Sequence, residues 1–570
     1  MSDSTPENKQ RSQYARPDEK GCPTFDWQLT SSSVCDVVRL VAKLEVLPVI
    51  FVPGIMGSNL RQNSKQKLPV WRLDTTLGQP LGLARDLSSA KAKDRQKLLH
   101  PDLVEVDPEG AVPERIDGIG NADAIRARGW GQVGQGSYHG FLEWLEEHLN
   151  PHELNPARWP EYRQVEATIG PIPKPGAEPK LFPGIKMRLE GEPFNAEAPF
   201  SSILTDDLLR RAKFWMPVHA VGYNWLASNQ KAAKDTLKPA ILRIIERYNA
   251  GQFSCSQVIL VTHSMGGLVV RACAQLPDMA DKIAGIVHGV MPATGAAVAY
   301  RRCKVGMADE SYIAGLVIGS TGQEVTAVFA QAPGALELLP SQDYRSGWLK
   351  IMQGNAPVDA WPKTNPYDDI YLCRDKWWGL VNEEWLSPKG GVPLKWGQYA
   401  RNVALSKEFH ANLSGKYHPN TYVYYGADPK QKSFEAVTWR MRRGLKPDDR
   451  PGPAAAHVKD FSAQQVRMDG VSPEYVGGGT EFFVSPVGMY ASTYETSYWE
   501  LHCEMQDGIG DGTVPQSSGA APLKGGNAGV KQQFRLTGFD HEKSYKNSDT
   551  ARRATLYAIT KITGTAKSRA

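Results

Sequence analysis

The chain has 570 residues, of which 41% are hydrophobic and 22% charged; these proportions are those of an ordinary folded protein and exclude a wholly disordered chain. Its 66 Lys and Arg residues against 61 Asp and Glu residues give a net charge of +5, too weak an excess to indicate a nucleic-acid partner. The length allows several domains, or one large domain with long insertions, and excludes a small scaffold held together by disulfides.

The N-terminal segment 1–23 is polar and charged, and we expect a mobile tail there. It lacks the apolar stretch of a signal peptide, which predicts synthesis in the cytoplasm and, if the protein acts elsewhere, export by another route. The seven cysteines form no C-x-x-C pair, a pattern typical of reduced thiols. A single disulfide between Cys22 and Cys35 remains compatible with their spacing.

Strands and helices alternate along much of the remaining chain. Apolar runs predict strands at 47–52, 218–223, 258–261, 283–290, 421–426 and 533–536, and helices at 229–249, 268–275 and 548–562. Such alternation is the signature of a parallel sheet covered by helices, so the predicted fold class is α/β. The alternation breaks at about 62–200, 296–416 and 440–497, and we interpret these three stretches as large insertions into one core that spans 24–570.

The central chemical feature is Ser264, in the turn THSMGG (262–267) between a predicted strand and a predicted helix. This context is typical of a nucleophile elbow, in which a serine occupies strained backbone and small neighbours prevent a clash. Gly266 stands at the second glycine of the G-x-S-x-G motif, whereas Thr262 replaces the first. The competing interpretation is an ordinary strand–helix turn without chemistry.

A second feature is the sequence VPGIMGS (52–58), directly after the first predicted strand. A serine hydrolase needs two backbone N–H donors about 3 Å from the oxygen of the reacting carbonyl. One comes from the residue after the nucleophile, here Met265, and the other from an early strand–helix loop, where Met56 or Ile55 fits. A glycine turn without function is the alternative.

A base and its orienting acid should follow Ser264 in the order acid, then histidine. His541 lies between a predicted strand and the last helix, where such a histidine belongs, and would take the Ser264 proton. Three acids are candidates: we rank Asp511, in GDGTVP, first; Asp428, after a strand, second; and Asp507 third. The chosen acid must accept the imidazole N–H while it stays ionised.

Six motifs occur in a characteristic order: VPGIMGS (52–58), GYNW (222–225), THSMGG (262–267), GALELLP (334–340), HPNTYVYYG (418–426) and GDGTVP (510–515). In this order they resemble the lecithin:cholesterol acyltransferase and GPI inositol-deacylase group of α/β hydrolases. The resemblance implies an α/β-hydrolase core with lid-like insertions and a triad of Ser264, Asp511 and His541. It also implies an oxyanion donor at Met56 and activity on acyl chains of lipids.

The chain also resembles bacterial lipase effectors of type VI secretion, which combine a deacylase-like core with bulky lids. That resemblance implies a membrane phospholipid substrate, delivery into the periplasm of a target cell, and an inhibitory immunity protein as a partner. We expect the segment 296–416 to form a lid or wall over Ser264, because insertions in this fold gather at the carboxyl edge of the sheet. Its tryptophans would suit contact with lipid or, alternatively, burial in a core: Trp361, Trp377, Trp378, Trp385 and Trp396.

The sequence predicts neither a cofactor nor a metal, because it contains no H-E-x-x-H, C-x-x-C, EF-hand or P-loop pattern. The leading hypothesis is a phospholipase A. An acyltransferase would share the same acyl-enzyme, and an esterase of non-lipid polyesters would share the same triad. A catalytically inactive, hydrolase-like binding protein is the non-enzyme alternative, which the joint presence of nucleophile, base, acid and oxyanion loop disfavours.

Overall fold

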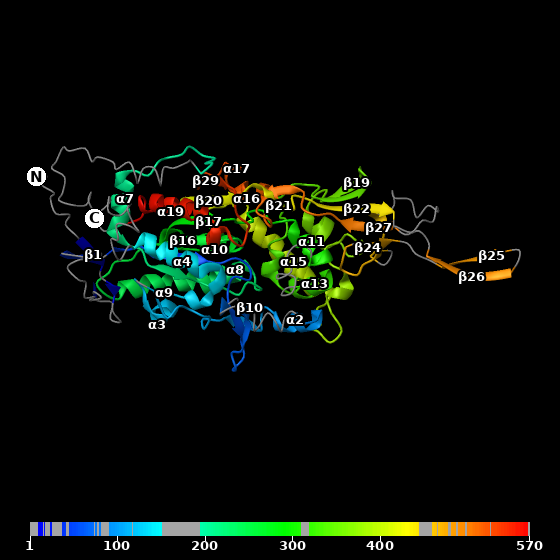
Figure 1. Cartoon of the computed structure of the whole chain (residues 1–570), viewed down its shortest axis with the longest axis horizontal. Helices are drawn as coiled ribbons and strands as arrows, with labels where there is room; N and C mark the ends of the chain where they lie inside the picture. The colour runs from blue at the N-terminus through cyan, green and yellow to red at the C-terminus, as the bar shows by residue number, and fades with distance from the viewer. Residues whose placement is uncertain are drawn as a thin grey trace, which may run out of the picture.

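The structure is a computed structural model of the whole chain (Figure 1). It describes residues 10–14, 16–17, 23–24, 37–41, 45–72, 75–76, 79–80, 90–116, 118–150, 194–308, 319–443, 459–463, 466–472, 474–476, 480–485, 488–495, 499–524 and 526–567. Cys22 and Cys35, whose spacing leaves a disulfide open, lie outside these residues.

Six parallel strands form the central sheet in the order β15–β6–β16–β17–β20–β29. In chain order they are β6 (Val49–Val52), β15 (Val218–Ala220), β16 (Val258–His263), β17 (Ile283–Gly289), β20 (Thr421–Gly426) and β29 (Val530–Leu536). Each lies where the sequence predicts a strand, and the predicted α/β fold class is confirmed. Because all six run in one direction, the loops that follow them meet at a single edge of the sheet.

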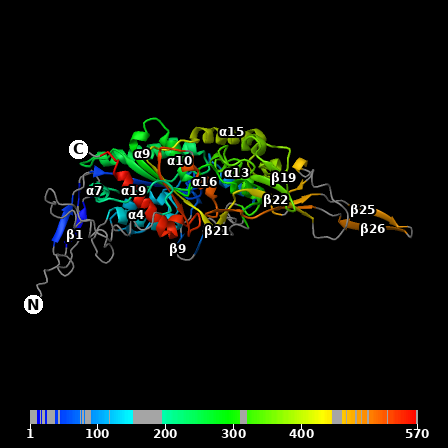
Figure 2. The same cartoon turned by 90° about the horizontal axis from the view of Figure 1, so that it is seen from above.

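Both faces of the central sheet are buried, because alternate side chains of its strands enter two different hydrophobic clusters. Ile50 and Val52 of β6 belong to one cluster, and Val49 and Phe51 to the other. Figure 2 shows α9 (Lys238–Asn249) and α10 (Gly266–Ala274) on one side of the sheet, and α4 (Gln135–Leu149) and α19 (Asp549–Thr563) on the other. The short helix α8 (Asn229–Ala232) packs against α10.

The structure differs from the sequence prediction at two helices. The helix predicted at 229–249 contains a π-helical turn, Ala233–Leu237, between α8 and α9. The helix α4 lies inside the stretch 62–200, which the sequence analysis treats as an insertion. Its Phe141 is fully buried, and the centre of its ring lies 5.7 Å from that of Phe51 of the central sheet, so α4 covers this sheet directly.

The insertions build a second six-stranded sheet, here called the cap sheet, in the order β19–β18–β22–β27–β24–β23. Its strands are β18 (Leu349–Gln353), β19 (Ala356–Trp361), β22 (Val437–Arg443), β23 (Val466–Arg467), β24 (Glu474–Val476) and β27 (Trp499–Cys503). Leu349 pairs with Val437 in parallel, so strands from two of the predicted insertions join in one structure. Figure 1 shows these strands beyond the helical part of the cap.

Helices connect the cap sheet to the central sheet. They are α11 (Val298–Val305), α13 (Gly322–Phe329), α14 (Pro333–Leu336) and α15 (Trp396–Leu413). The first insertion joins them through α2 (Ala92–Leu98): the Gln331 amide donates to the carbonyl oxygens of Gln96 and Leu99 at 2.7 and 3.0 Å. One hydrophobic cluster contains Leu260 of the central sheet together with Trp439 of the cap sheet, so the cap shares a core with the central sheet.

The tryptophans of the second insertion are mostly buried. Trp377 has no exposed surface, and Trp361, Trp378 and Trp385 are at most 9% exposed. The rings of Trp361 and Trp378 stack with centroids 4.2 Å apart. These four tryptophans are therefore core residues, and their burial gives no support for the alternative that they contact lipid.

Shorter strands complete the described chain: β1 (Gln10–Tyr14) with β4 (Val37–Val41), β5 (Glu45–Val46) with β14 (Phe214–Trp215), β7 (Leu60–Gln62) with β8 (Pro69–Trp71) and β11 (Val104–Val106), and β21 (Asp428–Ser433) with β28 (Gly508–Gly510). The pair β1–β4 lies partly in the segment expected to be a mobile tail. Other described elements are β12 (Arg115–Ile116), β13 (Gly120–Asn121), α3 (Ala122–Ala127), α7 (Thr205–Lys213), β25 (Thr480–Ser485), β26 (Gly488–Glu495), α16 (Gln516–Gly519), α17 (Ala521–Lys524) and α18 (Ser544–Asn547).

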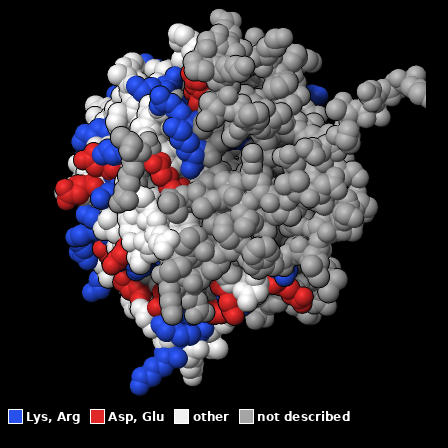
Figure 3. Space-filling view, turned by 90° about the vertical axis from the view of Figure 1, so that its left-hand side faces the viewer, with Lys and Arg blue, Asp and Glu red and all other residues white. Residues whose placement is uncertain are grey.

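The distribution of surface charge and the hydropathy of the helices bear on which partners the protein can contact. Over the described part of the end that faces the viewer in Figure 3, Lys and Arg side chains are interspersed with Asp and Glu. Among the described helices, none combines the length and the hydropathy needed to cross a bilayer.

Candidate active site

Ser264 lies in the turn between β16 and α10, at the carboxyl edge of the central sheet. Its φ angle is +51°, a strained value for a residue with a side chain, and its N–H donates to the Gly289 carbonyl oxygen at 2.9 Å. A Cβ atom on Gly266 would lie 2.4 Å from the Pro53 carbonyl oxygen, so only glycine lets the loop after β6 pass this turn. The sequence THSMGG thus forms the strained strand–helix turn that its pattern predicts.

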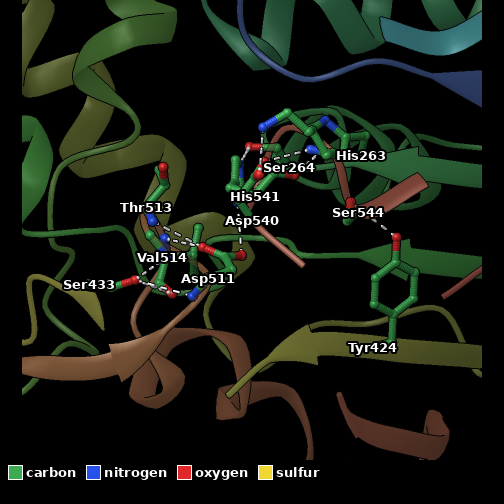
Figure 4. A network of polar contacts seen from close by, with 12 residues as sticks. His263, Ser264, Tyr424, Ser433, Asp511, Thr513, Val514, Asp540, His541 and Ser544 are labelled. Atoms are coloured by element: carbon green, nitrogen blue, oxygen red, sulfur yellow. Dashed lines mark hydrogen bonds and ion pairs between the residues drawn. The ribbon is translucent and has the colours of Figure 1, made fainter. Parts of the chain in front are cut away.

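The structure brings Ser264, His541 and Asp511 together in one hydrogen-bonded chain (Figure 4). The Ser264 Oγ lies 2.8 Å from the His541 Nε2, and the His541 Nδ1 lies 2.9 Å from the Asp511 Oδ2. Because an ionised carboxylate only accepts hydrogen bonds, the His541 proton resides on Nδ1. The Nε2 lone pair therefore faces the serine hydroxyl, which is the arrangement a general base requires.

Asp511 is held rigidly in this position. Its side chain is 1% exposed, and its Oδ1 accepts the backbone N–H groups of Thr513 and Val514 at 3.1 and 2.7 Å. Behind it, the Ser433 Oγ accepts the N–H of Asp511 at 3.2 Å. These bonds leave only Oδ2 for His541, so the carboxylate presents one defined oxygen to the imidazole.

The two other acid candidates lie in different networks. Asp428 accepts the N–H of Lys430 at 2.8 Å and, through its second oxygen, the N–H of Gly538 at 2.8 Å; these backbone bonds hold its pKa below the ordinary value. Asp507 accepts the N–H of Glu435 at 2.9 Å. Asp428 therefore supports the loop that carries His541 from outside, and among the described contacts neither acid bonds to the imidazole.

The loop after β6, where the sequence predicts one half of an oxyanion hole, lies against Ser264. Met56 has a φ angle of +63°, and its carbonyl oxygen accepts the Trp71 Nε1–H at 2.7 Å. In the described part of the chain, neither Met56 nor Met265 donates its backbone N–H to another residue. A Cβ atom on Gly54 would lie 3.0 Å from the Ser264 Cβ, so this loop packs directly against the candidate nucleophile.

A second histidine, His263, belongs to the site, and the sequence analysis missed it. Its Nε2 lies 2.9 Å from the His541 carbonyl oxygen, and its Nδ1 lies 3.1 Å from the Tyr138 hydroxyl. Burial, together with the neighbouring His541, lowers the pKa of His263 to about 3, so the ring is neutral. Its position next to Ser264 in the sequence was the available signal, whereas the partner Tyr138 is 125 residues away.

The site is nearly closed. Ser264 is 5% exposed, and the side chain of His541 is 14% exposed. In the part of the chain that the structure describes, no cluster of His, Cys, Asp and Glu side chains has the composition of a metal site.

The second insertion is anchored to α10, the helix that follows Ser264. Arg271 of α10 donates to the Leu413 carbonyl oxygen at 2.6 Å, at the end of α15, and to the Ala293 carbonyl oxygen at 3.2 Å. The segment 296–416 thus begins and ends beside the helix that follows Ser264. That it forms a lid or wall over the serine remains a prediction.

Comparisons with known proteins agree with this fold. Residues 208–307, which include Ser264, match the family model described as the PGAP1-like alpha/beta domain. One chain of the crystal structure of the Tle4–Tli4 complex is similar over 91% of this chain and 99% of that chain, with 29% sequence identity and a TM-score of 0.67. None of the curated proteins is significantly similar in sequence. The matches confirm the α/β-hydrolase fold, and the match over residues 208–307 confirms the predicted resemblance to the deacylase-like group.

Proposed function

We propose that this α/β hydrolase is a serine esterase whose catalytic triad is Ser264, His541 and Asp511. One observation carries the proposal: the hydrogen-bonded chain from the Ser264 Oγ through the two ring nitrogens of His541 to the Asp511 Oδ2, with distances of 2.8 and 2.9 Å. The positive φ at Ser264 and the close contact at Gly266, which only glycine allows, add the strained strand–helix turn of a nucleophile elbow.

In the first half of the reaction, the Ser264 oxygen attacks the acyl carbon of the ester while the His541 Nε2 takes its proton. The carbonyl oxygen becomes an oxyanion, which the backbone N–H groups of Met56 and Met265 stabilise. Asp511 stabilises the imidazolium that forms. His541 then returns the proton to the leaving alcohol, and the acyl group remains on Ser264.

In the second half, water replaces the alcohol. The His541 Nε2 takes a proton from water, the resulting hydroxide attacks the acyl-enzyme, and the fatty acid leaves when Ser264 regains its proton. An acceptor alcohol in place of water would give acyl transfer from the same intermediate.

We propose acyl esters of membrane phospholipids as the substrate. Two similarities support this: the PGAP1-like domain around Ser264, and the motifs shared with lipid acyl hydrolases. The burial of Ser264 adds a physical argument, because a site with 5% exposure must open before an acyl chain enters, and a lipid surface offers apolar contacts that favour opening.

The test is lipid product analysis with the wild type and Ser264→Ala on phosphatidylethanolamine vesicles, with and without an added alcohol. We expect lysophospholipid and free fatty acid from the wild type alone. Acyl esters of the added alcohol in place of fatty acid would instead identify an acyltransferase. Vesicles left intact by an enzyme that cleaves short-chain soluble esters would refute the phospholipid substrate.

We also propose that the protein is an antibacterial effector with a dedicated inhibitor. The similar structure is that of a complex between Tle4 and Tli4, which supports a protein partner for this chain. Directed into the periplasm of a susceptible bacterium, the wild type should arrest growth and Ser264→Ala should not. Equal growth of both strains, with no lysophospholipid formed, would refute the toxin role.

A further inference from the structure

We propose that Tyr138 and His263 form a neutral pair that positions the oxyanion loop and the loop of the catalytic histidine relative to each other. Both are positioning residues, because among the described contacts neither bonds to the Ser264 oxygen. This role rests on the proposed esterase function, since it concerns the geometry of the same site.

The direction of each hydrogen bond follows from its chemistry. A carbonyl oxygen only accepts, so the 2.9 Å contact between the His263 Nε2 and the His541 carbonyl requires the proton on Nε2. The neutral ring then offers the Nδ1 lone pair, and the Tyr138 hydroxyl donates to it at 3.1 Å. Burial raises the pKa of Tyr138, so its hydroxyl keeps the proton that it donates. Its oxygen in turn accepts the Gly54 N–H at 3.3 Å.

This chain of hydrogen bonds joins three loops that lie far apart in the sequence. It begins at Gly54 in the oxyanion loop, passes through Tyr138 of α4 and His263 of the elbow, and ends at His541 (Figure 4 shows the part at His263 and His541). Each of the three hydrogen bonds has one donor and one acceptor, and all three donate in the direction from Gly54 to His541.

The pair fixes the main chain of His541. The His541 N–H donates to the Asp511 carbonyl oxygen at 2.8 Å, and the His541 C=O accepts from His263. Both polar groups of this residue's backbone are therefore held, which keeps the imidazole between Asp511 and Ser264. Loss of the His263 bond would free the carbonyl end and let the ring move away from the serine oxygen.

The pair also fixes the oxyanion loop on both sides of Met56. A Cβ atom on Gly54 would lie 2.9 Å from the His263 Nδ1, and one on Gly57 would lie 2.7 Å from the Tyr138 hydroxyl. The two glycines thus allow the loop to rest on the two rings. The position of the Met56 N–H depends on this contact.

The His263 ring can hold this position only while it is neutral. A charged His263 would carry a proton on Nδ1, so that Tyr138 could no longer donate there. Its ring centre is 5.2 Å from that of His541, close enough to oppose the positive charge that His541 gains in the transition state. The ring is buried against Tyr138, His541 and Tyr545. Burial and His541 lower its pKa more than the negative charge of Asp511 raises it.

A second buried pair of histidine and tyrosine provides a control for the Tyr138 and His263 variants. His219 and Tyr248 are a second buried pair, with the His219 Nε2 2.8 Å from the Tyr248 hydroxyl, and burial lowers the pKa of His219 as well. This pair lies between β15 and α9 and, among the described contacts, touches neither the elbow nor His541. Tyr248→Phe removes the same type of bond as Tyr138→Phe, without a link to the site.

The experiment measures kcat and KM on a soluble short-chain nitrophenyl ester, with thermal unfolding as the check on folding. We expect Tyr138→Phe and His263→Phe to lower kcat by about 10²-fold, the effect of misplacing a reacting group by ~1 Å, with KM changed less than about twofold. His263→Gln keeps an N–H donor near the Nε2 position and should recover part of the loss. Tyr248→Phe should keep the wild-type kcat.

Two results would overturn the proposal: a wild-type kcat in folded Tyr138→Phe and His263→Phe, or an equal loss of kcat in Tyr248→Phe. A folded His263→Gln as slow as His263→Phe would overturn the bond to the His541 carbonyl. A wild type no more active than Ser264→Ala gives a different pattern and refutes the esterase function itself.

Discussion

Replacement of Asp511 by asparagine should disable the enzyme while leaving its shape unchanged. The Asp511 Oδ1 accepts two backbone N–H groups, from Thr513 and Val514, so an asparagine must place its carbonyl oxygen there. Its NH2 group then faces the His541 Nδ1 and donates to it. The ring must accept on Nδ1, so its proton moves to Nε2, the atom that has to accept the Ser264 proton.

The wrong tautomer should lower kcat by about 10⁴-fold, equivalent to about 5 kcal/mol in the activation free energy. The assay is steady-state hydrolysis of a soluble ester by Asp511→Asn, with Asp428→Asn and Asp507→Asn as controls of equal charge change. We expect the controls to lose far less, because their bonds go to backbone N–H groups outside the triad. A larger loss of kcat in folded Asp428→Asn than in Asp511→Asn would refute this reasoning.

Three further predictions test other parts of the structure. Ser264→Ala should fold normally and lose about 10⁵–10⁶-fold in kcat; turnover near the wild type would refute the nucleophile. Gly266→Ala adds a methyl group 2.4 Å from the Pro53 carbonyl oxygen, so the oxyanion loop must shift and both the melting temperature and kcat should fall; wild-type values of both would contradict that contact. Burial raises the pKa of Glu337 from 4.5 to about 8, so the native state keeps a proton that the unfolded chain releases, and stability should fall as pH rises from about 4.5 to 8. Glu337→Gln should remove this loss, up to about 5 kcal/mol, in denaturant unfolding at pH 5 and 9; an unchanged pH dependence would contradict it.

Much of the central sheet was predictable, because its signals are local. The run at 258–261 is buried on both sides and apolar throughout, and the turn that follows it must contain small residues, so the sequence indicates the position of Ser264 by itself. His541 and Asp511 were named through chain order and a motif. The structure brings both to Ser264, although their catalytic roles still await the experiments above.

The cap sheet could not be predicted in the same way. Its parallel pair β18–β22 joins Leu349 to Val437 across the whole of α15 and the central strand β20, and no local pattern encodes such a partner. The tryptophans illustrate the same limit, because the sequence does not show whether Trp377 is buried or faces a lipid. Its edge-on contact with Trp439, with ring centroids 5.5 Å apart, shows that it fills a core. His263 was overlooked for a similar reason, because its role depends on the distant Tyr138.

The order of the triad along the chain has a consequence for the cell that makes the protein. Ser264 is synthesised 277 residues before His541, and the strands β18, β22 and β27 of the cap sheet are made between them. Because chains emerge from the ribosome N-terminus first, a growing chain carries its nucleophile without base or acid until the cap strands have been made. Under the proposed function, the order of synthesis itself delays lipid cleavage, and a chain broken off anywhere before Asp511 is harmless to the membrane of its producer.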